Sequence, residues 1–139
     1  MNMASWAARK SSAPAVAVIL SVLCFGSCGR QTIVDPEKAK QQALAANFVD
    51  IDRRIEGGNV HDISRLSRAL SEAATPSSID RLEKIAHIQS VPAQLSVLED
   101  SKRISKRDQA RILKILGNSV DSEIQRETSK RLTELESQF

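Results

Sequence analysis

The chain has 139 residues, 27% of them charged and 3% aromatic, and its formal net charge is +3. This length fits a single small domain. Three Phe, one Trp and no Tyr leave little surface for stacking on bases or sugars, so the composition argues against nucleic-acid binding.

The first distinctive segment is an uncharged apolar run over residues 15–25, which follows Arg9 and Lys10 and leads into small residues. A positively charged N-terminal region, a short apolar stretch and small residues at the cleavage site are the three parts of a secretory signal. The run is shorter than the ~20 apolar residues that a transmembrane helix needs. We therefore predict a signal peptide over residues 1–27.

The end of that run, Phe25-Gly26-Ser27-Cys28, resembles the lipobox of bacterial lipoproteins, in which two small residues precede a cysteine that is acylated before the signal is removed. The resemblance covers residues 1–30 and departs from the usual pattern at Phe25, where Leu, Val or Ile is more common. It implies a lipid such as palmitate on Cys28 and a lipidated N-terminus and tether over residues 28–34. The alternatives are an ordinary cleaved signal with an incidental Cys28, or an uncleaved short anchor.

Removal of residues 1–27 changes both the net charge and the number of cysteines that could pair. The 20 basic residues become 18, against 17 acidic ones, so the basic character of the whole chain is no evidence for a nucleic-acid partner. Cys24 leaves with the signal and Cys28 carries the lipid, so no disulfide can form within the mature chain. Gly29 in place of Asp after the cysteine resembles lipoproteins sent to the outer membrane of Gram-negative bacteria. We therefore expect a lipid anchor on the periplasmic face of that membrane.

The first helix of the mature domain is expected to start at Asp35-Pro36-Glu37 and to stop at Gly57-Gly58. The start combines an N-cap side chain, a proline at the first helical position and an acid at the positive end of the helix dipole. Glycine after the last apolar residue is a common stop signal. The apolar residues recur at helical spacing, and the predicted inward face is Leu44, Phe48, Ile51 and Ile55.

Two further helices are predicted from about Val60 to Ala74 and from about Pro76 to Gln89, because Thr75-Pro76 breaks the pattern and starts it again. The inward residues expected for the first are Val60, Ile63, Leu66, Leu70 and Ala73. Those expected for the second are Ile79, Leu82, Ile85 or Ala86, and Ile88.

Three more helices complete the prediction. A fourth follows Ser90-Val91-Pro92 and ends near Asp100. A fifth begins with a Ser105/Asp108 capping arrangement and ends at Gly117, and a sixth begins within residues 119–121. Their expected inward residues are Leu95 and Leu98 in the fourth, Ile112, Leu113 and Leu116 in the fifth, and Ile124, Thr128, Leu132, Leu135 and Phe139 in the sixth.

No segment shows sustained period-two alternation, so the sequence predicts an all-α fold with five or six short amphipathic helices in a single domain over residues 35–139. The helices form either a small irregular bundle or a short stack of helical hairpins. Residues 105–135 resemble one HEAT repeat, with residues 121–132 as its second helix. The sequence of residues 81–85, RLEKI, also recurs as RILKI at residues 111–115, although any amphipathic helix of this composition can produce such an echo by chance.

The sequence contains no recognisable catalytic constellation. His61 and His87 stand on different predicted helices, without a nearby cysteine or a second histidine four residues away. No nucleophile elbow, phosphate-binding loop or dinucleotide fingerprint is present. We expect no catalytic residue, no metal site and no cofactor, and hence no enzyme. Three carboxylate pairs are interpreted as solvated charges on exposed faces or helix ends: Asp50/Asp52, Glu99/Asp100 and Glu134/Glu136.

Positive charge is concentrated in residues 102–114, which carry six basic side chains against a single acid, Asp108. Such a stretch could meet anionic head groups or an acidic partner. The alternative is a solvated loop and helix face that acids elsewhere in the chain balance. The candidate contact residues are Arg103, Lys106, Arg107, Arg111 and Lys114.

These features favour a lipid-anchored periplasmic interaction module, for instance an accessory of a secretion or conjugation system in the cell envelope. The analogy is with small helical lipoproteins that serve such machines. The expected partners are the membrane, through the N-terminal lipid, and a protein of the envelope. The alternatives are a structural outer-membrane lipoprotein without a single dedicated partner, and an envelope enzyme, which the missing constellation disfavours.

Overall fold

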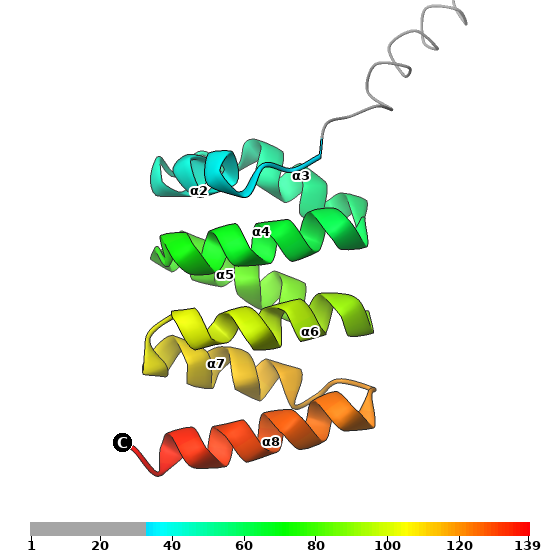
Figure 1. Ribbon diagram of the computed structural model, residues 1–139, viewed down its shortest axis with the longest axis vertical. Coiled ribbons are helices and arrows are strands. Elements are labelled where there is room, and N and C mark those ends of the chain that lie inside the picture. Colours follow the sequence, from blue (N-terminus) through cyan, green and yellow to red (C-terminus); the bar gives the residue numbers. More distant parts are fainter. Residues whose placement is uncertain (1–32) are drawn as a thin grey trace, which may run out of the picture. The chain divides into compact units, whose positions relative to one another are not determined.

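The computed structural model describes residues 33–139, and all regular secondary structure in this part of the chain is helical (Figure 1). The predicted signal peptide and Cys28 lie outside the described residues. The described part has seven α-helices and one short 3-10 helix, so the all-α prediction is confirmed and the predicted number of helices is too low. The elements are α2 (Pro36–Leu44), α3 (Val49–Gly57), α4 (Val60–Ala73), α5 (Pro76–Ala86), α6 (Val91–Asp100), η1 (Ser101–Arg103), α7 (Lys106–Leu116) and α8 (Ser122–Glu136).

The additional helix arises from a turn inside the segment that was predicted as one helix. Residues 45–48 leave the helical path, and Ala46 adopts a φ of 59°. This left-handed conformation costs an L-residue about 1–2 kcal/mol, which is why glycine usually occupies it. Neither glycine nor proline marks the turn in the sequence, so the break is imposed by packing.

The packing reason lies in the inward face of α2. Ala39 and Ala43 are buried there, whereas Leu44 is 49% exposed. In α3 the predicted inward residues Ile51 and Ile55 are buried. The prediction that Leu44 continues the stripe of α3 is therefore wrong, because two small residues, and not the leucine, bring α2 close to its neighbour.

The starts of the other helices follow the capping signals closely. Asn59 caps α4 by accepting a hydrogen bond from the Asp62 amide, and Ser105 caps α7 by accepting one from the Asp108 amide. Such caps satisfy backbone donors that have no partner inside the helix. Five helices among the described residues begin in this way, with the caps Asp35, Asn59, Thr75, Ser105 and Asp121.

The helices of residues 34–139 pack in two rows, and the helices of one row run antiparallel to those of the other (Figure 1). The first row contains α2, α4, α6 and α8, and each of these helices contacts the next. The second row contains α3, α5 and α7, of which α5 contacts α4, α6 and α7. The apolar core lies between the rows, and its largest fully buried apolar side chains are Ile51, Ile63, Leu66, Leu70, Ile79, Leu82, Ile85, Ile112, Leu113, Leu116 and Ile124.

Besides Leu44, three residues expected to face inward are exposed instead. Val60 of α4 is 38% exposed, Leu95 of α6 is 49% exposed, and Phe139, which follows α8, is 72% exposed. In addition, α5 ends at Ala86, three residues before the predicted end. Each error falls at a helix end or in α6, whose sequence is apolar on more than one side.

Candidate functional site

The basic stretch over residues 102–114 forms η1, a short turn and α7. The structure divides the five candidate contact residues into two groups. Arg103 and Arg111 make ion pairs within the chain. Lys106, Arg107 and Lys114 are exposed on α7 and have no ion-pair partner among the described residues. The predicted patch is therefore only partly available to a ligand.

Arg111 is bound by acids of two helices. One guanidinium nitrogen lies 2.8 Å from a carboxylate oxygen of Glu83 and 3.7 Å from one of Asp80, both on α5. A second nitrogen lies 3.4 Å from Asp108 on α7 itself. Arg111 thus ties α7 to α5, and its charge is largely compensated within the chain.

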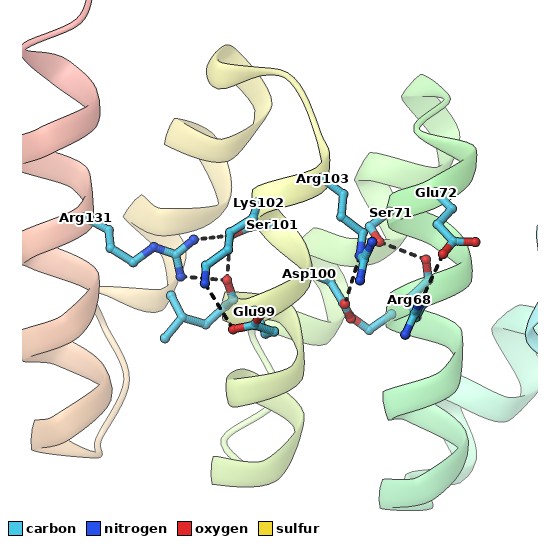
Figure 2. Close-up of polar contacts among 11 residues, drawn as sticks. Arg68, Ser71, Glu72, Glu99, Asp100, Ser101, Lys102, Arg103 and Arg131 are labelled. Atoms are coloured by element: carbon cyan, nitrogen blue, oxygen red, sulfur yellow. Dashed lines mark hydrogen bonds and ion pairs between the residues drawn. The ribbon is translucent and has the colours of Figure 1, made fainter.

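Arg103 extends from η1 to Asp100, the last residue of α6, with 3.6 Å between the guanidinium nitrogen and the carboxylate oxygen (Figure 2). The Ser67 hydroxyl of α4 donates a 2.8 Å hydrogen bond to the same carboxylate. Asp100 is buried, which contradicts its interpretation as a solvated charge. Burial raises the pKa of the Asp100 carboxyl, and Ser67 and Arg103 oppose that change by favouring the charged form.

A second contact near η1 comes from α8, where Arg131 donates a 2.7 Å hydrogen bond to the Leu98 carbonyl and a 3.2 Å bond to the Ser101 hydroxyl. Ser101 in turn donates to the Leu98 carbonyl. Figure 2 shows Arg131 beside Ser101, while Arg103 lies beside Asp100. The last turn of a helix has carbonyls without intrahelical partners, so Arg131 completes the end of α6. This role was not predicted.

A shallow hollow of about 330 Å³ lies between α4 and α6. Two of the charged side chains in its wall have intrachain partners: Arg68 pairs with Glu72 at 3.1 Å, and Glu99 with Lys102 at 3.4 Å. The hollow therefore offers no uncompensated charge to a ligand. Its lining consists of Ser64, Arg68, Leu95, Ser96, Glu99 and Asp100.

The second row has its own charged contact, between α3 and α5. Arg81 donates two 3.0 Å hydrogen bonds to the Asp52 carboxylate and lies 4.0 Å from the centre of the Phe48 ring. The Arg81 guanidinium lowers the pKa of Asp52, and the pair raises the pKa of Arg81. Arg81 and Arg111 occupy the same position of the sequence echo, and each reaches back to an acid on the preceding helix of its row.

The two histidines lie on different helices: His61 is exposed at the start of α4, and His87 is exposed at the end of α5. Over residues 33–139, no three side chains of His, Cys, Asp or Glu come together in a way that could hold a metal ion.

No helix in the described part of the chain is both long and apolar enough to cross a membrane. The chain matches no protein-family model, no curated protein and no solved structure.

Proposed function

We propose that the protein is a lipid-anchored interaction module on the periplasmic face of the outer membrane, and that it serves an assembly of the cell envelope such as a secretion or conjugation system. The observation that carries this proposal is the lipobox-like Phe25-Gly26-Ser27-Cys28 at the end of a short apolar run. A lipidated Cys28 would hold the helical domain close to the membrane, because residues 29–34 span about 20 Å when extended.

The arrangement of the helices supports a scaffold role. Helices α4, α6 and α8 begin at residues 60, 91 and 122, so successive hairpins have similar lengths. The equivalent residues Arg81 and Arg111 make equivalent contacts with the preceding hairpin. These regularities favour a short HEAT-like stack over an irregular bundle, and stacks of this type present extended binding surfaces.

A binding role is also supported by the way in which the charged side chains pair within the chain. Arg81 and Arg111 use carboxylates to join helices, and Asp100, the one buried carboxylate among the described residues, is held by Ser67 and Arg103. Charged side chains that are paired in this way hold neighbouring helices together and so stabilise a rigid surface. We propose a protein that binds other proteins and catalyses no reaction.

Replacement of Cys28 tests the anchor. In the organism or in a host that processes lipoproteins, Cys28→Ala should abolish incorporation of labelled palmitate and release the chain from the membrane fraction. Several acyl chains anchor stably, since each buried methylene contributes about 0.8 kcal/mol. The matched control is Cys24→Ala, which should keep both label and membrane association. Label that persists in Cys28→Ala would refute the proposed anchor.

A further inference from the structure

The outward face of α7 carries positive charge without acidic partners. Arg107 and Lys114 are seven residues apart, so they share one helical stripe and stand about 10 Å apart along the axis. Lys106, the residue before Arg107, is also exposed at the start of α7, and none of the three has an ion pair among the described residues. Arg111 lies between them on the sequence, but its guanidinium is directed to Glu83 of α5.

This concentration is peculiar to α7. Elsewhere in the described chain, most arginines have carboxylate partners, and the basic residues without ion pairs are dispersed over other helices. These dispersed residues are Lys38, Lys40, Arg65, Lys84, Lys130 and Arg131, of which Arg131 is hydrogen-bonded to the end of α6.

We propose that the α7 face formed by Lys106, Arg107 and Lys114 binds an acidic segment of a partner protein, with carboxylates about two helical turns apart. This inference rests on the proposed function and names the chemistry of the partner. The contact between α7 and α5 is an example of such binding inside the chain. Arg111 of α7 binds the acids Asp80 and Glu83, which lie one turn apart on α5.

An acidic protein segment fits this face better than a lipid surface does. Every exposed side chain of α7 is basic, so the helix has no exposed apolar side chain that could enter a bilayer. The Arg107 guanidinium is planar and donates hydrogen bonds in fixed directions, which suits a carboxylate held in a defined position.

The test uses the purified full-length protein in detergent and two synthetic helical peptides. The peptides are identical except that one has two glutamates seven residues apart and the other has glutamines there. Binding is measured by calorimetry, and the contact residues are located from amide chemical shifts. The glutamate peptide should bind about tenfold more tightly than the glutamine peptide, with the largest shifts in α7 and with weaker binding at higher salt.

Charge reversal on α7 should remove that preference. Arg107→Glu with Lys114→Glu is expected to weaken binding of the glutamate peptide about tenfold or more. The matched control, Lys38→Glu with Lys130→Glu, makes the same change in net charge at exposed positions on α2 and α8 and should leave binding unchanged. If the reversed protein loses helicity, Arg107→Gln with Lys114→Gln gives the same comparison with a milder change.

Three results would overturn the proposal: no preference for the glutamate peptide, equal loss in the α7 variant and its control, or α7-dependent binding to phosphatidylglycerol vesicles without peptide binding. The last result would assign the face to the membrane. The peptide titration needs no bilayer, so it tests the α7 surface separately from the anchor. Palmitate label that persists in Cys28→Ala would refute the anchor and leave the α7 surface in place, whereas a Cys28→Ala protein that loses label but shows no preference for the glutamate peptide would refute the α7 proposal alone.

Discussion

The polar contacts that join the helices within a row differ between the two rows. In the row of α2, α4, α6 and α8, the contacts are drawn into the interior. Ser67 of α4 donates to the buried carboxylate of Asp100 in α6, and Arg131 of α8 donates to the Leu98 carbonyl. The Asp100 carboxylate also pairs with Arg103, and the Leu98 carbonyl also accepts from the Ser101 hydroxyl, so both acceptors have more than one partner.

In the row of α3, α5 and α7, the contacts lie nearer the surface. Arg81 pairs with Asp52, whose side chain is 34% exposed, and Arg111 pairs with Glu83 while 48% of its own side chain stays exposed. Exposed ion pairs contribute only about 0.2–1 kcal/mol each, whereas a buried group that loses its hydrogen-bond partner costs about 1–3 kcal/mol. The first row therefore constrains the fold more strongly, and the second can carry a variable charged surface.

The largest loss of stability should follow from a change in the core that both rows share. Leu66 of α4 is 1% exposed, so Leu66→Ala should lower the free energy of unfolding by about 2–5 kcal/mol. Leu95→Ala, at a half-exposed position on α6, should change it by only about 0.5 kcal/mol. Urea unfolding followed by circular dichroism measures both. Equal losses in the two variants would contradict the packing described for α4 and α6.

A smaller loss is expected when the buried contact of the first row is broken. Ser67→Ala removes the hydroxyl that donates to Asp100 and should cost about 1–3 kcal/mol, because the carboxylate stays buried. Ser64→Ala, one turn earlier at an exposed position of α4, is the control and should have little effect. A Ser67→Ala protein as stable as the control would show that Asp100 does not depend on this bond.

The two rows should also differ in the sign of their dependence on pH. Asp52 has a lowered pKa, so its contribution to stability is present above its ordinary pKa and is lost as the pH falls through the lowered value. Asp100 has a raised pKa, so the stability linked to its protonation is present below its ordinary pKa and is lost as the pH rises through the raised value.

Asparagine variants separate these two contributions. Asp52→Asn should reduce the loss of stability on the acidic side, and Asp100→Asn should reduce the loss that accompanies rising pH. Urea unfolding over a pH series gives the slope of the unfolding free energy against pH for each variant and for the unchanged protein. Slopes that change in the same direction in both variants would mean that the rows do not differ in this way.

The sequence predicted best where local signals and packing agree. The bounds of α4 were expected almost to the residue, because Gly57-Gly58 and Thr75-Pro76 flank it and one apolar stripe runs through the helix. The turn between α2 and α3 was missed because Ala45 and Ala46 favour a helix. Only the packing of Ala39 and Ala43 against the core explains why the chain turns there.

The candidate site shows the same limit for charged residues. The concentration of basic residues was visible in the sequence, but the partners of Arg103 and Arg111 were not, because the acids of α5 lie about 30 positions before Arg111 and the burial of Asp100 depends on α4. Spacing alone places Arg107 and Arg111 on one face. The structure shows that only Arg107 is available there, together with Lys106 and Lys114.

Mechanical load would act first on α2 if the chain is held at its N-terminus and pulled through a partner on α7. This helix has nine residues, and its only buried side chains are two alanines, fewer than in any other helix of its row. Its detachment would lengthen the link to the anchor from about 14 Å of helix to about 30 Å of extended chain. The helices that carry the proposed binding face would stay folded, so α2 would act as an extensible element that absorbs tension before the rest of the domain yields.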